Sequence, residues 1–328
     1  MKPNILAYGE LWNGTHATLI CAAARKLGYS ATAFDFYQSR LFAGSSRFLA
    51  RAARRIFGPL NSNLINRGFR DAIEAVKPTT VIVSKGVDLY PETLSFAKAL
   101  GIKLINWSPD DYLNDANSSA HLINSLPIYD LIVSARPHRF EIYRQHGARA
   151  LLYIDWYYIP EIHYPRATPK DTLLGFIGSW SHDRESAILQ IKTPCTIHGG
   201  GWGRSSAQLR RRHTVVNKVL NHDEYPLVLS RTMYNLNFFT KENYDGSNQR
   251  LFEVPACGSV LVSECSEVVE AVYGPEAACI TFKAPEEVDS LLKRSQEPEA
   301  MALRGRRIVE SGPYNFAARF ASLIPHIT

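Results

Sequence analysis

The stretch NYDGSNQRLFEVPACGSVLVSE, residues 243–264, decides the fold. An apolar strand at Leu236–Phe239 precedes it, and a second apolar run at Val260–Ser263 lies within it. Between them come a loop of small and polar residues and an apolar helix near Gln249–Ala256, followed by Gly258, which can adopt positive φ. The order strand, loop, helix, strand predicts one βα repeat of a parallel α/β sheet.

The same alternation extends outward over the whole chain. In the N-terminal half, apolar strands at Asn4–Tyr8 and Thr80–Ser84 alternate with helices at Ala17–Leu27 and Gly68–Val76. Around Tyr157–Lys170 three prolines interrupt the periodicity, and the strand and helix pattern then restarts. We therefore expect two Rossmann-like domains that face each other across a cleft, with ligands at the carboxyl ends of the strands.

Length and composition agree with this organisation. The 328 residues suffice for two domains of ordinary size, over residues 1–160 and 171–312, and 45% hydrophobic content is typical of a folded protein. The sequence has five cysteines, an odd number, and no C-x-x-C motif. Both features argue against a disulfide framework or a zinc site. We therefore expect a protein of the reducing cytoplasm, and no apolar run reaches the length of a membrane span.

Basic charge is concentrated between Arg40 and Arg70, where seven arginines occur without a single acid. Four of them have helical spacing among apolar residues and predict a basic amphipathic helix: Arg47, Arg51, Arg54 and Arg55. Such a face can attract an anionic membrane surface, a lipid-diphosphate acceptor or nucleic acid, and a merely solvated face fits equally well. Of these partners we favour peripheral contact with the inner face of the membrane over nucleic acid.

The chemistry of the deciding stretch points to a bound nucleotide. Free N–H groups at a helix start can hold a diphosphate, and Arg250 adds a cation that can pair with phosphate oxygens. Glu253 lies one turn into the helix, where a carboxylate can accept the hydroxyls of a ribose. The predicted donor loop before the helix consists of Gly246, Ser247 and Asn248.

The run R-x-F-E-x-x-A-C-G-x-x-L-x-x-E, residues 250–264, resembles the CgeB-like glycosyltransferases, a bacterial family. It also resembles retaining GT-B transferases, which carry an E-x7-E motif. The aligned pair here is Asp245 and Glu253. The resemblance implies that Asp245 contacts the donor sugar, with a catalytic role, and that Glu253 contacts the ribose. The first acid is aspartate, one methylene shorter than the family's glutamate.

Other pieces carry the same resemblance over roughly residues 170–325. LLGFIGSWSHDRES resembles the first strand and glycine loop of the donor domain, which implies that Gly178 and Arg184 contact the diphosphate. CTIHGGGW resembles a second glycine element and suggests a close approach to the ligand or the cleft at Gly199. The family's GT-B fold implies that a C-terminal helix, Tyr314–Leu323, crosses back to the N-terminal domain within residues 313–328.

Candidates for the acceptor side follow strands of the N-terminal half. Asp110 and Asp111 follow the strand Lys103–Trp107 and could serve as a general base or orient the acceptor hydroxyl, or could cap the next segment. Glu10, Asn13 and His16 lie in and after the first loop, which could line an acceptor pocket or be a plain turn. No D-x-D motif or metal-type histidine spacing occurs, so we expect neither a metal nor a cofactor.

The predicted activity is transfer of a sugar from a UDP-, GDP- or dTDP-linked donor to a hydroxyl of a glycan, a lipid-linked acceptor or a protein, as in polysaccharide biosynthesis. The resemblance implies retention of configuration at the anomeric carbon. Two alternatives stay open at this point. One is a nucleotide-sugar epimerase on the same fold. The other is a non-catalytic protein that binds nucleotide-sugars or nucleic acid.

Overall fold

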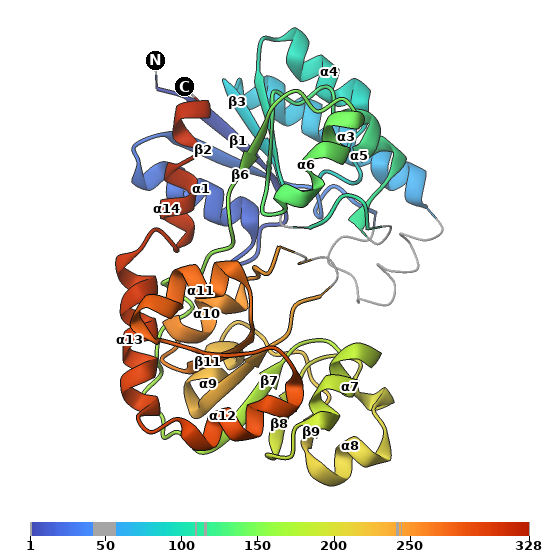
Figure 1. Cartoon of the computed structure of the whole chain (residues 1–328). Helices are drawn as coiled ribbons and strands as arrows, with labels where there is room; N and C mark the ends of the chain where they lie inside the picture. The colour runs from blue at the N-terminus through green and yellow to red at the C-terminus, as the bar shows by residue number, and fades with distance from the viewer. Residues whose placement is uncertain are drawn as a thin grey trace. The chain divides into compact units, whose positions relative to one another are not determined.

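The structure is a computed structural model, and it describes residues 2–41, 57–108, 110–114, 117–240, 243 and 245–327. The chain forms two compact units (Figure 1). Unit 1 comprises Met1–Asp155 and Phe316–Thr328, and unit 2 comprises Trp156–Asn315. The proline-containing segment at the start of unit 2 is packed rather than extended, since Tyr158, Ile159 and Ile162 are buried.

Unit 1 is a parallel six-stranded sheet in the order β2-β1-β3-β4-β5-β6 with helices around it. Its core includes Leu6 and Tyr8 of β1, which alternate with residues of the opposite face and join Ile65 and Phe69 of α3. The elements are β1 (Asn4–Gly9), α1 (His16–Lys26), β2 (Ser30–Asp35), α3 (Gly58–Val76), β3 (Thr80–Val83), α4 (Pro91–Ala99), β4 (Lys103–Trp107), α5 (Ala120–Ser125), β5 (Leu131–Ser134), α6 (Phe140–Gln145), β6 (Leu151–Tyr153) and α14 (Phe316–Ala321).

Unit 2 is a second parallel six-stranded sheet in the order β12-β11-β10-β7-β8-β9. Leu174 and Phe176 of β7 lie in its core with Leu236 of β10. The elements are β7 (Thr172–Ile177), α7 (His182–Gln190), β8 (Cys195–His198), α8 (Ala207–Arg212), β9 (Thr214–Val216), α9 (Glu224–Arg231), β10 (Thr232–Asn237), α10 (Arg250–Ala256), β11 (Val260–Glu264), α11 (Glu267–Tyr273), β12 (Ile280–Phe282), α12 (Val288–Arg294) and α13 (Pro298–Ser311).

The C-terminal helix α14 belongs to unit 1, although the chain reaches it only after completing unit 2. It contacts α1, and its buried Phe316 stacks on Trp107 with ring centroids 5.4 Å apart. Phe320 stacks on the same indole at 6.4 Å. The prediction of two Rossmann-like α/β units with a C-terminal helix that returns to the first is therefore confirmed.

Helix lengths were the weaker part of the prediction. The helix expected at Gly68–Val76 begins already at Gly58, because its buried face carries Asn61 and Asn66, which hide the apolar period. Both amides are paired: Asn61 accepts from the Leu41 N–H, and Asn66 donates to a backbone carbonyl of the next loop. The sequence pattern also missed α13, since its buried residues are mostly small.

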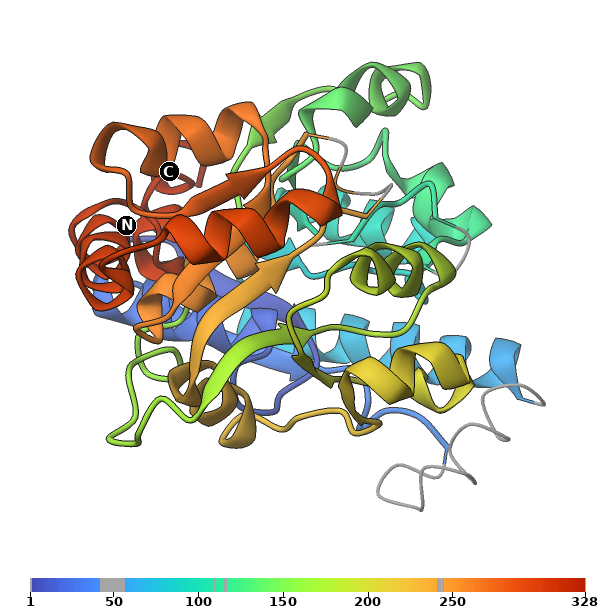
Figure 2. The same cartoon turned by 60° about the horizontal axis from the view of Figure 1, so that its bottom comes forward.

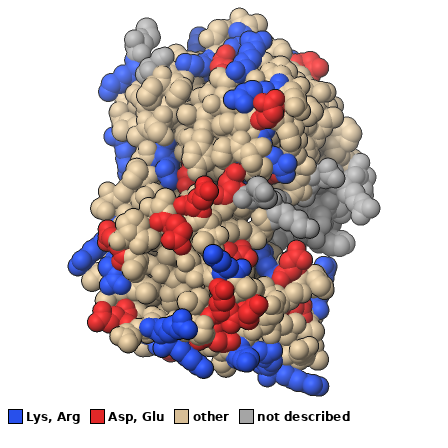
Figure 3. Space-filling view, viewed as in Figure 1, with Lys and Arg blue, Asp and Glu red and all other residues tan. Residues whose placement is uncertain are grey.

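The basic segment can be assessed only in part, because Arg47, Arg51, Arg54 and Arg55 lie outside the described residues. Arg40 forms an ion pair within unit 1, and Arg70 stacks on Phe96. These two arginines therefore make specific contacts rather than only facing solvent. Lysine, arginine and acidic side chains are interspersed over the face shown in Figure 3. Among the described residues, no helix is long and apolar enough to cross a membrane.

Candidate functional site

The sheet of unit 2 has a switch point between β7 and β10. From β7 the chain adds β8 and β9 on one side, and from β10 it adds β11 and β12 on the other. The strands run side by side in Figure 2, coloured from green to orange. Loops that leave neighbouring parallel strands in opposite directions leave room for a ligand at the carboxyl ends. The loops after β7 and β10 are therefore where a site is expected.

Two predicted donor glycines, Gly178 and Gly199, meet in this region. The Gly178 N–H donates to the His198 carbonyl at 2.9 Å, and Trp202 Nε1 donates to the Gly178 carbonyl at 2.7 Å. Gly199 has φ +148°, and a Cβ there would lie 2.0 Å from the Gly178 carbonyl oxygen. Both positions thus have a packing reason to be glycine, and a contact with the donor stays a prediction.

Arg184 lies in the first turn of α7, directly after the Gly178 loop. Its Nη1 donates to the Ser179 carbonyl at 2.8 Å, and its guanidinium lies over the Phe176 ring at 5.6 Å. Its buried Nε has no hydrogen-bond partner among the described residues. Burial lowers the pKa of Arg184, and the nearby charge of Arg250 lowers it further against the opposing effect of Glu264. Two cations thus share this edge of the sheet.

Arg250 opens α10 and binds Glu253 on the same helix. Arg250 Nη1 donates to Glu253 Oε2 at 2.8 Å, and the Tyr225 hydroxyl donates to the same oxygen at 2.5 Å. The guanidinium also lies over the Tyr225 ring at 5.0 Å. Burial lowers the pKa of Arg250, but Tyr225 and Glu253 more than offset it, so this pKa lies above its ordinary value. The predicted ribose ligand Glu253 is therefore a buried carboxylate that is already engaged.

The other oxygen of Glu253 faces His163, a residue that the sequence interpretation did not select. His163 Nδ1 accepts the Ile159 N–H at 3.0 Å, so its Nε2 carries the proton of the neutral ring. That Nε2 lies 3.4 Å from Glu253 Oε1. Burial lowers the pKa of His163 even though Glu253 opposes the shift, which keeps the ring neutral. Neither His163 nor Tyr225 stands in a recognisable motif, so no sequence signal pointed to them.

The predicted donor loop, residues 246–248, packs against residues of β10 and residues that follow β11. Gly246 has φ +70°, and a Cβ there would lie 2.3 Å from Ser266 Cβ. Asn248 Nδ2 donates to Asn237 Oδ1 at 2.8 Å, which leaves the buried Asn248 Oδ1 without a partner among the described residues. Ser247 beside it is buried. The loop thus brings Gly246, Ser247 and Asn248 to the same sheet edge as Arg250, while Asp245 at its start is half-buried.

Asp110 and Asp111 of unit 1 have different surroundings. Asp111 is 1% exposed, and its Oδ2 accepts from Arg139 Nε at 3.0 Å and Nη2 at 2.9 Å. Its Oδ1 accepts the Leu113 N–H at 3.0 Å. Asp110 is half-buried and forms an ion pair with Lys85. The structure therefore holds Asp111 in an internal ion pair and leaves Asp110 as the more accessible of the two.

The three residues expected on the acceptor side, Glu10, Asn13 and His16, have three different environments. Glu10 lines a cavity at the carboxyl ends of β1 and β3, whereas Asn13 is exposed on the loop. His16 is buried, with its ring edge-on to Trp107 at 4.8 Å, and its Nδ1 lies 3.1 Å from the Ser84 hydroxyl. Burial, assisted by the charge of Lys85, lowers the pKa of His16 to about 3. His16 is thus a neutral packed ring.

Potential metal ligands are dispersed in this structure. Over the part of the chain that the structure describes, no three His, Cys, Asp or Glu side chains gather closely enough to hold a metal ion. Cations at the switch point of unit 2 are Arg184 and Arg250, of which Arg250 is paired with Glu253. This arrangement can bind and stabilise an anion through guanidinium groups.

Residues 183–324 match the protein family described as glycosyl transferase-like. The matched segment begins in α7 and includes Arg184, the donor loop and α10. No curated protein matches the sequence. The match thus supports a glycosyl transferase-like domain around the unit 2 site, while the narrower likeness to CgeB stays a prediction.

Solved structures resemble the whole chain. Sucrose-phosphate synthase from Thermosynechococcus elongatus has a TM-score of 0.65 at 12% identity, with 98% of each chain covered. Anabaena HepE in complex with UDP-glucose has a TM-score of 0.64 at 11% identity, with 99% of each chain covered. A Listeria monocytogenes protein assigned as a UDP-N-acetylglucosamine 2-epimerase has a TM-score of 0.59 at 10% identity, with 100% of this chain and 96% of that chain covered. The chain has a GT-B fold.

Proposed function

We propose that the protein is a metal-independent glycosyltransferase that moves a sugar from a nucleoside diphosphate sugar to a hydroxyl group. The observation that carries this proposal is the pair of arginines, Arg184 and Arg250, at the switch point of unit 2. Both lie within the segment that matches the glycosyl transferase-like family. Guanidinium groups pair well with the oxygens of a diphosphate, and among the described residues Arg184 has no acidic side chain bonded to it in the way that Glu253 is bonded to Arg250.

In this proposal the arginines act on the leaving group. Negative charge develops on the diphosphate as the sugar departs, and positioned guanidinium groups stabilise it more than water does. Arg184 has an uncommitted Nε for this purpose, among the described residues. Arg250 is held by Glu253, so that bond fixes the direction of its guanidinium. The helix α10 has only seven residues, so we assign the anion to the side chains rather than to its N-terminus.

The remaining donor contacts follow from the resemblance. We assign the sugar to Asp245 and the ribose to Glu253, with Gly178, Gly199, Gly246, Ser247 and Asn248 lining the donor. The Glu253 Oε2 is engaged twice, whereas in the described part of the chain its Oε1 has only His163 Nε2 at 3.4 Å, so Oε1 is the oxygen that we assign to a ribose hydroxyl. HepE was solved with UDP-glucose, which supports testing uridine donors first; GDP- and dTDP-sugars follow.

The acceptor is a hydroxyl of a glycan, a lipid-linked sugar or a protein. Asp110 is the half-buried acid of its pair, so we assign to it the orienting or basic role and to Asp111 the positioning of the segment around Arg139. Retention of configuration is the outcome that the resemblance implies. We place the protein in the cytoplasm, with contact to the inner membrane face through the arginines of residues 40–70.

A thermal-shift series tests the proposal. The full chain is heated with UDP, GDP, dTDP and CMP and with their sugars, because a ligand of the folded state raises the melting temperature by mass action. We expect one nucleotide to stabilise and its sugar to be consumed only when an acceptor is added. A new isomer formed without an acceptor would indicate the epimerase alternative instead. Absence of any nucleotide effect would sink the proposal.

A further inference from the structure

His163 lies in the segment through which the chain enters unit 2, shortly after the first residue of this unit, Trp156. Its own turn holds the ring. The His163 N–H donates to the Ile159 carbonyl at 2.7 Å, and the Ile159 N–H donates back to His163 Nδ1 at 3.0 Å. The side chain is only 5% exposed. These two bonds give Nε2 a defined position and place the proton of the neutral ring on it.

Aromatic and charged groups surround this ring. The Tyr225 ring lies edge-on to it at 5.7 Å, and Glu253 Oε1 lies 3.4 Å from Nε2. Burial lowers the pKa of His163, the charges of Arg250 and His222 lower it further, and Glu253 opposes the shift. His163 is therefore a neutral N–H donor beside a buried carboxylate.

The carboxylate of Glu253 is held unequally at its two oxygens. Arg250 Nη1 and the Tyr225 hydroxyl both donate to Oε2, at 2.8 and 2.5 Å. The last torsion of a glutamate side chain is broad, so the partners of a carboxylate decide its rotation. Among the described residues only His163 faces Oε1. The position of Oε1 therefore depends on His163.

The separation of 3.4 Å between His163 Nε2 and Glu253 Oε1 is longer than a strong hydrogen bond, for which N–H···O distances are about 2.7–3.2 Å. The N–H group thus attracts Oε1 without saturating it. A carboxylate oxygen has two lone pairs, and Oε1 keeps the capacity to accept a hydroxyl.

We propose that His163 is a positioning residue, which holds Glu253 Oε1 in the orientation that accepts a ribose hydroxyl and so makes unit 2 select ribonucleotides. The inference rests on the proposed function, since the ribose contact of Glu253 is part of it. Fixing an acceptor before the ligand arrives lowers the entropy that binding costs. A ring that served only to fill space would influence all nucleotides alike.

Two polar substitutions separate the nitrogens of His163. The amide of asparagine reaches the place of Nδ1, so His163→Asn keeps a partner for the Ile159 N–H and removes the donor beside Glu253. The longer amide of glutamine reaches the place of Nε2, so His163→Gln keeps that donor and loses the bond to Ile159. A packing role predicts that the two variants behave alike.

Calorimetry on the full chain measures the selection. The probes are UDP and GDP, each compared with its 2′,3′-dideoxy counterpart, which lacks both ribose hydroxyls. We expect the native chain to bind one ribonucleotide about tenfold more tightly than its dideoxy counterpart. His163→Asn should reduce this ratio to about twofold or less, and His163→Gln should keep most of it. Affinity for the dideoxy nucleotide should stay unchanged in both variants.

The matched control is His222→Gln. His222 is exposed on the loop before α9, and its charge also reaches His163. This variant should keep the affinities and their ratio within about twofold of the native values, because exposed charges are well screened. Equal ratios in His163→Asn and His163→Gln, or equal losses for both kinds of nucleotide, overturn the inference.

NMR of the native chain gives a second readout that does not depend on the folding of a variant. The Nε2–H signal of His163 is followed in protein with labelled histidine rings. It should shift when the ribonucleotide binds and shift far less with the dideoxy nucleotide. Equal shifts with both nucleotides, or none with either, contradict the positioning role.

The outcomes separate this inference from the proposed function. Absence of nucleotide binding by the native chain contradicts the proposed function. Nucleotide binding that distinguishes ribose from dideoxyribose, but does so equally well in His163→Asn, contradicts the inference alone.

Discussion

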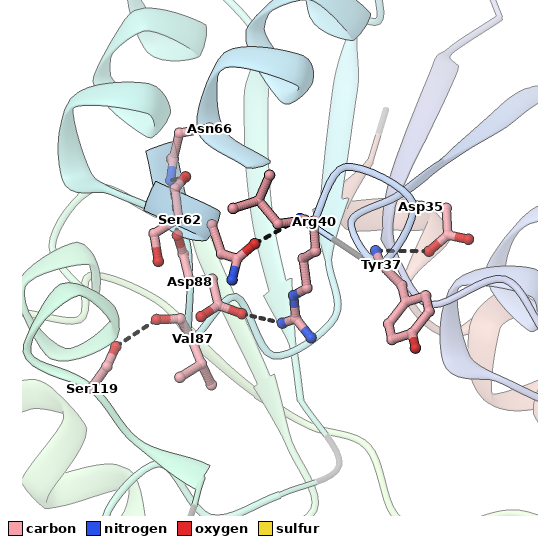
Figure 4. A network of polar contacts seen from close by, with 10 residues as sticks. Asp35, Tyr37, Arg40, Ser62, Asn66, Val87, Asp88 and Ser119 are labelled. Carbon is pink, nitrogen blue, oxygen red and sulfur yellow. Dashed lines mark hydrogen bonds and ion pairs between the residues drawn. The ribbon is translucent and has the colours of Figure 1, made fainter. Parts of the chain in front are cut away.

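The two units have the same sheet topology, but the charged side chains at their switch points are paired differently. Each has six parallel strands and loops that diverge from two adjacent strands. In unit 2 Arg250 is paired with Glu253, but the charge of Arg250 lowers the pKa of Arg184, and a buried nitrogen of Arg184 has no partner among the described residues. In unit 1, whose sheet divides between β1 and β3, the cations that line the cavity at the ends of these strands are paired with acids, as in Arg40 with Asp88 (Figure 4). The same topology thus occurs in both units, and the side chains at the two switch points differ in how their charges are paired.

The two units also differ in the backbone conformation of the loops at their switch points. Unit 2 places glycines where two loops touch, and at Gly199 a side chain would collide with a carbonyl oxygen. Unit 1 places Lys85 in the left-handed region, and the Asn106 side chain donates a hydrogen bond to the Lys85 carbonyl. Close approach of loops therefore shapes the unit 2 site, whereas fixed polar side chains shape the unit 1 cavity.

The largest effect is expected from Glu253→Ala in unit 2. It leaves half-buried Arg250 without its counter-charge and the Tyr225 hydroxyl without its acceptor, and it empties a buried site, which should lower the stability of unit 2 by about 3–5 kcal/mol. Amide hydrogen exchange in β10 and β11 measures the loss. The control is Glu310→Ala, which breaks the exposed pair with Arg306 and should cost less than about 1 kcal/mol. Similar losses in both variants would mean that Glu253 is not a structural anchor.

The next largest effect is a loss of stability at acidic pH that is expected in unit 1. The pKa of His16 is lowered to about 3, so below pH 6.5 the unfolded chain takes up a proton that the folded chain refuses. This group should therefore reduce the stability of unit 1 by up to about 1.4 kcal/mol per pH unit, or about 3 kcal/mol between pH 6.5 and pH 4. Exchange of the β1 and β3 amides over this range measures the slope.

A matched pair of variants isolates the contribution of His16. His16→Phe keeps an aromatic ring and should flatten the acid slope in unit 1. His146→Phe, at an exposed position, should leave the slope unchanged. An unaltered slope in His16→Phe would show that another group causes the acid sensitivity.

A third test compares two left-handed glycines, one from each unit. Gly246→Ala should lower the stability of unit 2 by about 2–3 kcal/mol, because it combines unfavourable φ with a Cβ 2.3 Å from Ser266 Cβ. Gly101→Ala in unit 1 has similar φ and nothing within 4 Å, so only the conformational cost of about 1 kcal/mol applies. Denaturation midpoints of both variants give the difference. Equal shifts would mean that Ser266 moves away at no cost.

The smallest expected effect concerns ligand affinity. Arg184→Ala should weaken binding of the preferred nucleoside diphosphate about tenfold, or about 1.4 kcal/mol, by calorimetry. Arg204→Ala removes an exposed arginine that stacks on Trp180 beside the same loop, and it should leave the affinity within twofold. If both variants bind alike, Arg184 does not contact the phosphates.

The sequence predicted the strands better than the helices. Apolar runs such as Thr80–Ser84 correspond closely to β3, because a strand buried on both faces must be apolar throughout. The helix α3 was shortened in the prediction, since Asn61 and Asn66 fill positions where periodicity requires apolar residues. Their hydrogen bonds are made to loops distant in sequence, and no local pattern contains that information.

The sequence by itself determined the two parallel α/β units and the placement of Arg250 and Glu253 one turn apart, because strand periodicity and helix spacing are local properties. The returning C-terminal helix was implied by the family resemblance rather than by a local pattern. Only the tertiary structure decided the partners. It joined Glu253 to Tyr225 and His163, paired Arg40 with Asp88, and buried His16 against Trp107. These contacts depend on strand order, which brings distant segments together, and charge balance at a site can be judged only once those segments meet.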